Sequence, residues 1–404
     1  QQALEDLVTA FNNDMETCFF WFMPQIQQRD SGSLFIASDD DFFFFEGTFG
    51  HLSTTLKNPY SGAVISIDEN LYINTGIYYG GIGTDVLIMD VTSEFLQLAV
   101  NGKQYIDSVE IILGSDGPNI IILADPTIIY GDVTIISDSG NDIIWSNNGN
   151  DTLYGGTGND IIDGGGGNDL IYGDENNDIL NGGAGDDVIY GGADADMISG
   201  DKGNDTLYGE SGNDTLNGGA GIDLLNGGAG DDILYVNGDF TWSAGFVAWN
   251  VGSPDSVING ERITVSPRTG STDVFIGGDG YDRLYMADGG QAIFLDDVYS
   301  ASPLDPHAPR IQGIEEIYGG NGNDIIDLTS KVHSYGDVTL HGGNGNDVLW
   351  ASAGDDVIYG DAGNDNIDGG TGNDRLIGGA GNDTLYGRGG ADTFVFDAAS
   401  YRTG

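Results

Sequence analysis

The sequence predicts an all-β protein with two tandem parallel β-rolls, in which short strands stack on one another. The rolls have β-rich flanking segments, and a short helix lies at the N-terminus. Three observations lead to this prediction. A nine-residue phrase rich in Gly and Asp repeats without a gap from Ser137 to Tyr235, and again over residues 342–395. The hydrophobic content of 39% is too high for a disordered acidic chain. The 64 acidic and 12 basic residues give a formal net charge of −52. Repulsion between these charges would oppose a compact state, so we expect bound cations to neutralise them.

The repeat has a fixed internal pattern. In the eleven units of the first run, position six is always Asp, position eight is always Ile or Leu, and position four is Gly in nine units. The two exceptions at position four are Asn176 and Asp194, residue types that tolerate a left-handed backbone. We therefore expect the first six residues of each unit to form a turn and the last three to form a short strand. The second run has six units, and related single units occur at 277–285 and 319–327.

The same pattern predicts a row of cation sites along each edge of the coil. Alternation points the middle residue of each strand inward, so Ile144, Leu153 and Ile162 should stack in a thin apolar core. If two units make one coil, units n and n+2 lie about 4.8 Å apart, and their Asp carboxylates and turn carbonyls converge on the gap between them. Such oxygen ligands suit Ca²⁺ better than Zn²⁺ or Mg²⁺. The expected carboxylate ligands are Asp142, Asp151, Asp160, Asp169, Asp178, Asp187, Asp196, Asp205, Asp214, Asp223, Asp232, Asp324, Asp347, Asp356, Asp365, Asp374, Asp383 and Asp392, with carbonyls of glycines such as Gly155, Gly164, Gly182, Gly342, Gly369 and Gly378.

Roughly a dozen Ca²⁺ ions are expected if each site needs two turns of one edge. Two other interpretations of the repeats are an acidic linker and a metal-free solenoid. A linker has no reason to keep Ile or Leu at every ninth residue. Stacked rows of Asp without a counter-ion would repel one another.

These units resemble the RTX (repeats-in-toxin) nonapeptide GGxGxDxUx, which is associated with Ca²⁺ and a parallel β-roll. The resemblance implies an RTX protein of the non-enzymatic surface-layer or extracellular-matrix kind. RTX proteins typically leave Gram-negative bacteria unfolded through a type I channel, so it also implies a secreted protein at the cell surface or beyond. The phrase ADTFVFDAAS at 391–400 is similar to one that often precedes the secretion segment in this family, and we expect the polypeptide to continue beyond it.

The chain also repeats on a larger scale. YGDVTIISDSGNDIIW at 130–145 corresponds to YGDVTLHGGNGNDVLW at 335–350. We infer two copies of one module, each with a β lead-in, interpreted as wider coils or a small sheet, before its nonapeptide run. The expected segments are an N-terminal helix plus aromatic β segment at 1–79, a lead-in at 80–136, the first β-roll at 137–235, an inter-module β segment at 236–276, a second lead-in at 277–341, the second β-roll at 342–395 and a tail at 396–404.

Three stretches outside the repeats contain many aromatic residues. Apolar residues from Leu4 to Phe22 recur at helical spacing and predict an amphipathic helix over 2–22. In DDDFFFFEG at 39–47, the phenylalanines of a strand would point to both faces, so either the domain's own core or another subunit must cover them. The inter-module segment has three aromatic residues that form either a carbohydrate platform or an ordinary packing cluster: Trp242, Phe246 and Trp249.

The sequence contains no recognisable catalytic motif. Its four histidines lie outside any HExxH motif, and neither GxSxG nor GxxxxGK[ST] occurs. The single cysteine, Cys18, lies in the expected aromatic helix, where core packing is the simpler role. We therefore expect this chain not to be an enzyme.

These observations favour a secreted calcium-binding structural protein that folds and self-assembles on Ca²⁺ outside the cell, as a surface layer, filament or matrix. The expected partner is the chain itself as a homopolymer, with cell-surface polysaccharide as a further candidate. The charge argues against nucleic acid, and no apolar run is long enough for membrane insertion. The alternative is the RTX region of a larger type I-secreted adhesin, toxin or enzyme whose active domain lies outside this chain. A third hypothesis is an enzyme within 1–79 or 236–276.

Overall fold

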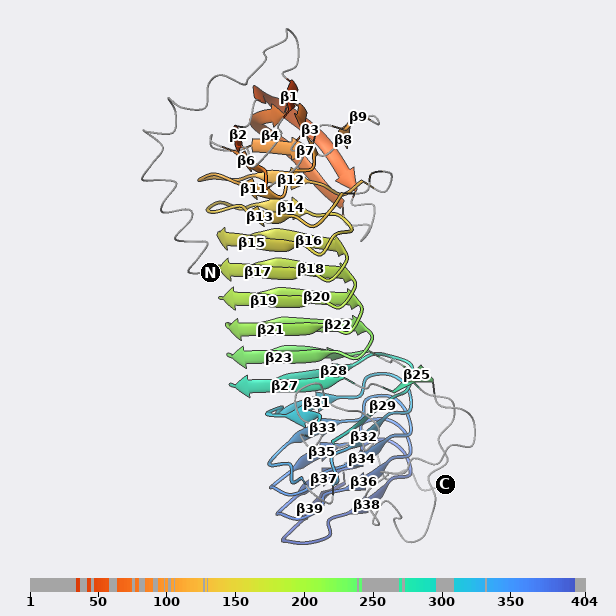
Figure 1. Cartoon of the computed structure of the whole chain (residues 1–404). Helices are drawn as coiled ribbons and strands as arrows, with labels where there is room; N and C mark the ends of the chain where they lie inside the picture. The colour runs from red at the N-terminus through yellow and green to blue at the C-terminus, as the bar shows by residue number, and fades with distance from the viewer. Residues whose placement is uncertain are drawn as a thin grey trace.

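The computed structural model describes residues 106–125, 128, 130–237, 273–295, 309–330 and 333–396, together with residues 84–89, Leu96 and the backbone of further strands before 106 and between 237 and 273. These parts form one elongated column of stacked β-coils (Figure 1). No helix occurs in the described part of the chain, and the all-β, parallel β-roll class is confirmed. The helix expected at 2–22 and the aromatic residues Trp242, Phe246 and Trp249 lie outside the described residues.

Three long sheets run along the column, and two small sheets lie among the earlier strands. Sheet 1 contains β2 (Phe42–Phe44), β6 (Val86–Ile88), β11 (Ile111–Leu113), β13 (Thr134–Ile136), β15 (Thr152–Thr157), β17 (Leu170–Glu175), β19 (Val188–Ala193), β21 (Thr206–Ser211), β23 (Leu224–Ala229), β27 (Val274–Asp279) and β30 (Ile311–Gln312). Sheet 2 contains β3 (Gly47–Lys57), β4 (Val64–Asn74), β7 (Glu94–Gln97), β12 (Ile120–Ile122), β14 (Ile143–Trp145), β16 (Ile161–Gly166), β18 (Ile179–Ala184), β20 (Met197–Lys202), β22 (Thr215–Ala220), β24 (Ile233–Val236), β28 (Arg283–Met286), β31 (Glu316–Tyr318), β33 (Thr339–His341), β35 (Val357–Tyr359), β37 (Arg375–Ile377) and β39 (Thr393–Val395).

Sheet 3 belongs to the second half of the chain. It contains β25 (Phe240–Thr241), β26 (Thr269–Gly270), β29 (Gln291–Phe294), β32 (Ile325–Asp327), β34 (Val348–Trp350), β36 (Asn366–Asp368) and β38 (Thr384–Tyr386). The small sheets contain β1 (Leu34–Ile36), β5 (Ile77–Tyr79) and β10 (Ile106–Asp107), and the hairpin of β8 (Ala99–Val100) and β9 (Lys103–Gln104). The first roll therefore lies between sheets 1 and 2, and the second between sheets 2 and 3.

Strand pairing within the runs joins each unit to the second unit after it, so two nonapeptides make one coil as predicted. Leu153 pairs with Ile171 in sheet 1, and Ile162 pairs with Leu180 in sheet 2, both in parallel register. The chain thus alternates between the two sheets, and every second unit lies on the same edge. This arrangement places the turn of unit n directly against the turn of unit n+2.

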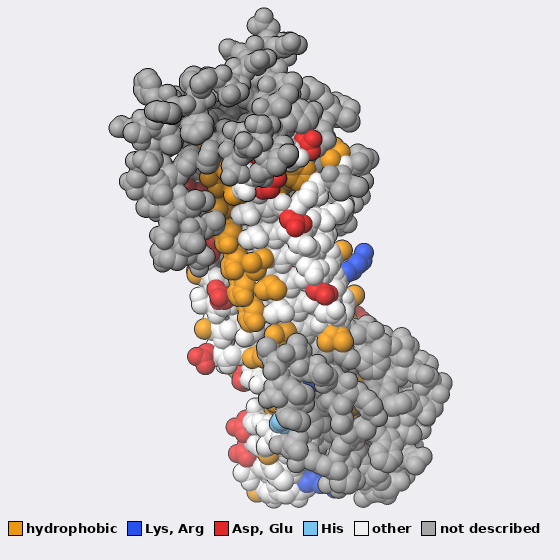
Figure 2. Space-filling model, viewed as in Figure 1, with side chains coloured by type: hydrophobic (Ala, Val, Ile, Leu, Met, Phe, Trp, Pro, Cys, Tyr) orange, Lys and Arg blue, Asp and Glu red, His pale blue; other side chains and the backbone are white. Residues whose placement is uncertain are grey.

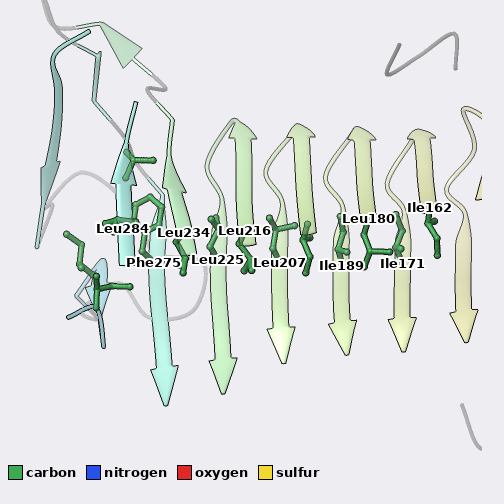
Figure 3. Close-up of a cluster of buried hydrophobic side chains, with 14 of the residues drawn as sticks. Ile162, Ile171, Leu180, Ile189, Leu207, Leu216, Leu225, Leu234, Phe275 and Leu284 are labelled. Atoms are coloured by element: carbon green, nitrogen blue, oxygen red, sulfur yellow. The ribbon is translucent and has the colours of Figure 1, made fainter. Parts of the chain in front are cut away.

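The core is a single file of position-eight side chains from both sheets. In the first run these residues point inward between the sheets (Figure 3) and are at most 2% exposed. This row of core side chains continues past the first run, because Phe275 and Leu284 occupy the same inward position in the next coil. The inward direction of position eight is therefore confirmed: Ile144, Leu153, Ile162, Ile171, Leu180, Ile189, Ile198, Leu207, Leu216, Leu225 and Leu234 are all buried.

The turns use left-handed backbone at two positions of the unit. At position four, Asn176 and Asp194 replace Gly with φ of 79° and 73°, as predicted from their residue types. Position two is also left-handed, and the sequence analysis did not anticipate this. Asp174 has φ of 75° and Glu210 has φ of 70° at that position.

The two rolls form one continuous solenoid, because sheet 2 runs through both. After the first run, the next strands of sheets 1 and 2 are β27 and β28. Leu234 pairs with Leu284 and Leu225 pairs with Phe275, in each case across a far longer stretch of chain than the two nonapeptides of an ordinary coil. The rung β27 spans the boundary that the sequence analysis placed at residue 276, so the last residues of that segment belong to the roll.

Both lead-ins are wider coils of the same solenoid. Ile112 pairs with Ile135 and Ile317 pairs with Leu340, so each of these coils is longer than two nonapeptides. The two coils occupy corresponding positions in the two modules inferred from the sequence. The strand β2 (Phe42–Phe44), within the aromatic segment at 39–47, also joins the column, since it pairs with β6 through Phe43 and Leu87.

The outer face of sheet 1 presents a row of stacked aromatic rings. Tyr154, Tyr172, Tyr190 and Tyr208 follow one another with ring centroids 4.9 to 5.0 Å apart and nearly parallel planes. In Figure 2, hydrophobic side chains gather over the middle rungs of the column, and acidic side chains appear only as separate spots. Most of the acidic charge of the repeats is thus not on this surface.

Candidate metal centre in the carboxylate ladders

The position-six aspartates form ladders along the edges of the coils. Oδ1 of Asp160 accepts a hydrogen bond of 2.7 Å from the main-chain N–H of Asp142, and Oδ1 of Asp178 accepts one of 2.8 Å from that of Asp160. The same bond links successive coils along the whole of each run, so each carboxylate reaches back to the preceding coil. Ladder 1 comprises Asp142, Asp160, Asp178, Asp196, Asp214, Asp232, Asp282 and Glu315; ladder 2 comprises Asp151, Asp169, Asp187, Asp205, Asp223 and Asp273; ladder 3 comprises Asp324, Asp347, Asp365 and Asp383; ladder 4 comprises Asp356, Asp374 and Asp392.

The second carboxylate oxygen of most ladder residues is buried without a hydrogen-bond partner. A buried acceptor of this kind is costly, because burial removes its contacts with water without replacing them. Native structures rarely leave such atoms unless an ion or water completes the site. Among the described residues, the Oδ2 atoms concerned include those of Asp160, Asp169, Asp178, Asp187, Asp196, Asp205, Asp214, Asp232, Asp282, Asp356, Asp365 and Asp374.

In the units that begin with glycine, the orphaned oxygen faces that glycine and the neighbouring coil. A Cβ on Gly173 would collide with Asp178 Oδ2 and would lie 2.6 Å from the carbonyl oxygen of Gly191, in the next coil of the same edge. The convergence of two oxygen atoms explains why position one is Gly in most units. The site predicted between units n and n+2 thus contains carboxylate and carbonyl oxygens directed at the same small space.

Burial raises the pKa of the ladder carboxyls far above the ordinary value for Asp. Desolvation is the largest cause, neighbouring carboxylates add to it, and the main-chain hydrogen bond opposes it. The pKa of Asp169 and of Asp178 rises to about 8, and that of Asp187 and of Asp205 to about 7. Without a cation, these rows are therefore partly protonated at neutral pH.

These features fit Ca²⁺. The ion takes six to eight oxygen ligands from carboxylates, carbonyls and water in flexible geometry. Within the described residues, no group of three or more His, Cys, Asp or Glu side chains converges on one point. This agrees with the ladder geometry, in which two carboxylates and main-chain carbonyls, and not a cluster of side chains, would hold each ion. When bound, calcium supplies the positive charge that these rows lack and joins one coil to the next.

The structure places all eighteen predicted aspartates on the edges of the coils, immediately before a strand. All are at most 2% exposed except Asp383 and Asp392 in the last two units, which are half-buried. Of the glycines named above, Gly182, Gly342 and Gly378 direct their carbonyl oxygens toward the preceding coil. The carbonyl of Gly155 instead accepts a hydrogen bond from the Ser137 hydroxyl, and Gly164 and Gly369 face Asp169 and Asp374 through their Cα atoms.

Asp151 is a predicted ligand with local side-chain hydrogen bonds from its own unit. In the unit at 146–154, position one is Ser146, whose hydroxyl donates to Asp151 Oδ2. The side-chain amide of Asn147 also donates to this oxygen at 3.2 Å. These two donors from its own turn stabilise the negative charge of Asp151.

The sequence analysis missed three carboxylates that complete the ladders. Asp273, Asp282 and Glu315 accept main-chain hydrogen bonds from Asp223, Asp232 and Asp282 respectively, at 2.8 to 3.0 Å. Asp282 is position six of GGDGYDRLY, so the motif itself offered a signal. Asp273 and Glu315 lie in units without the glycine pattern and could be found only through strand pairing.

Side chains at position five form a separate set of ladders that run in the opposite direction along the column. Oδ1 of Asn141 accepts from the N–H of Asn159 at 3.0 Å, and Oδ1 of Asn159 accepts from the N–H of Asn177 at 3.1 Å. These side chains reach forward along the column, whereas the aspartates of position six reach back. The position-five and position-six hydrogen bonds together hold each turn to both of its neighbours.

Comparison with known proteins agrees with this geometry. The chain matches the family described as RTX calcium-binding nonapeptide repeat (4 copies) over residues 130–153, 136–171, 145–180, 172–207, 208–240, 312–329, 336–367 and 368–398. No curated protein matches the chain. Fold and ladders define a calcium-binding parallel β-roll protein. The chain belongs to the proteins that contain RTX calcium-binding nonapeptide repeats, which here extend across residues 130–398.

Within the described residues, no helix is both long and apolar enough to cross a membrane.

Proposed function

We propose that this chain is a secreted structural protein that folds on Ca²⁺ outside the cell and assembles there into a surface layer, filament or matrix. The observation that supports this most is the series of buried, unpartnered carboxylate oxygens in the ladders. Rows of this kind oppose folding unless a cation is present, so they make the fold conditional on calcium.

A fold that depends on calcium suits a chain that is exported unfolded through a channel and then folds in a calcium-rich medium. In low calcium the ladder carboxylates repel one another and the chain stays expanded. In abundant calcium the same carboxylates and the carbonyls of neighbouring turns become ligands, and site formation and folding are one event. Circular dichroism should therefore show little regular structure in chelator and cooperative β formation near the roughly 0.1–1 mM range of extracellular calcium modules.

Self-assembly is supported by the open end of the solenoid. In the last described rung, Phe394 takes the core position but is 42% exposed, and Phe396 is 64% exposed. A second copy stacked on this rung would cover both side chains and pair with β39. Such head-to-tail contacts repeat without closing and produce filaments or sheets. The N-terminal helix expected at 2–22 and the phenylalanines at 42–45 are the proposed partner surface of the next copy.

Negative-stain electron microscopy with millimolar Ca²⁺ and with chelator tests this function. We expect ordered filaments or sheets in calcium and none in chelator. Deleting residues 1–47 should leave folded, calcium-loaded monomers. If the shortened chain still polymerises, the proposed contact is wrong.

The second candidate is the RTX region of a larger adhesin, toxin or enzyme. The exposed last rung supports it equally, because a further coil of the same polypeptide would cover Phe394 in the way that each coil covers the one before. Discrete monomers in both calcium and chelator would favour this function. We propose no catalytic activity for the chain itself, and an activity screen against polysaccharides tests that point.

A further inference from the structure

Ladder 1 continues across the coil from β28 to β31, which we call the joint between the two rolls. The N–H of Asp232 donates to Asp282 Oδ1 at 2.9 Å, and the N–H of Asp282 donates to Glu315 Oε2 at 2.8 Å. Within the first run, the N–H of Asp214 donates to Asp232 Oδ1 at 2.8 Å in the same way. The next rung of sheet 2 begins after Val338, which has no carboxylate, so Glu315 is the last ladder residue of the first roll.

Asp282 has the features of the ladder aspartates inside the runs. Its side chain is fully buried, and its Oδ2 has no hydrogen-bond partner. A Cβ on Gly277 would collide with this Oδ2 and with the carbonyl oxygen of Gly313. In the first run, Gly209 faces Asp214 Oδ2 and the Gly227 carbonyl oxygen in the same arrangement.

The joint preserves this geometry although its sequence spacing differs. In a nonapeptide the carbonyl comes from the glycine five residues before the Asp, whereas at the joint Gly313 precedes Glu315 by two residues. Residues 241–311 also lie outside the segments matched by the repeat family. Gly313 and Glu315 also line an open cavity of about 560 Å³, so water can reach these two residues.

The same pair occurs in the first module. The N–H of Asp85 donates to Glu110 Oε2 at 2.8 Å, and the N–H of Glu110 donates to the Asp85 carbonyl at 3.1 Å. Asp282 and Glu315 form both bonds with distances of 2.8 and 3.1 Å. An Asp followed by a Glu in the next coil is therefore part of the module and not an accident of the joint.

We propose that Asp282, Glu315 and the main-chain oxygen of Gly313 bind a Ca²⁺ ion that joins the two rolls, outside the nonapeptide runs. Two carboxylates and a carbonyl are hard oxygen ligands, and the wide joint leaves space for water ligands, as Ca²⁺ requires. The ion would hold β28 against β31, where the coil is longer than two nonapeptides. This inference rests on calcium filling the ladders.

Native mass spectrometry of the full chain, counting bound Ca²⁺, tests the proposal with matched variants. Glu315→Gln keeps an acceptor for the Asp282 N–H but removes the charge, and should lose one ion. Glu316→Gln is the control, since Glu316 faces outward beside Arg283 at 3.4 Å, and should keep the full number. Asp282→Asn should lose at least one ion. Unchanged ion counts in both Glu315→Gln and Asp282→Asn would overturn the joint site.

Wild-type crystals soaked with Tb³⁺ provide a test that needs no variant to fold. An anomalous peak between Asp282, Glu315 and the Gly313 carbonyl is expected, in addition to peaks along the ladders. Peaks in the ladders with none at the joint would refute this site and leave the proposed function intact. No bound ion anywhere in the wild-type chain would instead refute calcium-dependent folding.

Discussion

The hydroxyl of Tyr130 bonds to both main-chain groups of Val109, donating to its carbonyl oxygen at 2.7 Å and accepting from its N–H at 2.9 Å. Tyr335 repeats both bonds with Ile314 at 2.8 Å. The two tyrosines occupy corresponding positions of the two modules, and each closes the wide coil of its lead-in. The duplication inferred from sequence therefore extends to individual hydrogen bonds in the core.

Replacing Tyr130 with Phe should destabilise the first module by about 1–3 kcal/mol, because the change leaves the N–H and C=O of Val109 buried without partners. Denaturant unfolding in saturating Ca²⁺ measures this change. Tyr335→Phe should give a loss of similar size. A Tyr130→Phe variant as stable as the wild type would contradict the role assigned to the hydroxyl.

Asp187→Ala should weaken calcium binding more than Asp142→Ala. Asp187 has ladder carboxylates on both sides, from Asp169 and Asp205, whereas the coil before Asp142 presents the N–H of Asn119 in place of an Asp. The first change therefore removes a ligand from two shared sites and the second from one. Calcium titration by calorimetry compares them, and equal losses would argue against ligands shared along a ladder.

Gly173→Ala should reduce calcium affinity by about tenfold or more, equivalent to ~1.4 kcal/mol. The new Cβ would occupy the space where Asp178 Oδ2 and the Gly191 carbonyl converge. Gly336→Ala is a suitable control, because a Cβ there has nothing within 4 Å. Similar calcium titrations for both variants would show that the first glycine of the unit is not required by the site.

Calcium binding should release protons and strengthen as pH rises from 6 to 8. Burial raises the pKa of Asp169 to about 8 from an ordinary value of 3.8, so the folded metal-free chain binds more protons than the unfolded chain between these values. The free energy of unfolding of the metal-free chain therefore falls as pH rises through this window. Circular dichroism in chelator should show more β structure at pH 5 than at pH 8. The opposite trend would contradict the protonated ladders.

The sequence by itself determined the contents of a rung. The inward side chain at position eight, the left-handed backbone of Asn176 and Asp194, and the coil of two nonapeptides all follow from a period of nine. These features are local, because each unit contacts units only one or two periods away in the chain. Any sequence with this period repeats the same contacts, so the pattern alone defines them.

Only the tertiary structure decided how the runs connect. Leu234 pairs with Leu284, which lies far from it in the sequence, and the same part of the column brings Asp273, Asp282 and Glu315 into the ladders. Strand pairing sets that register across segments whose lengths are not multiples of nine, and no local pattern encodes it. The hydrogen bond from Ser146 to Asp151 likewise depends on how one turn folds over its own carboxylate. Periodicity fixed the unit, and hydrogen bonding between distant strands fixed the single continuous solenoid.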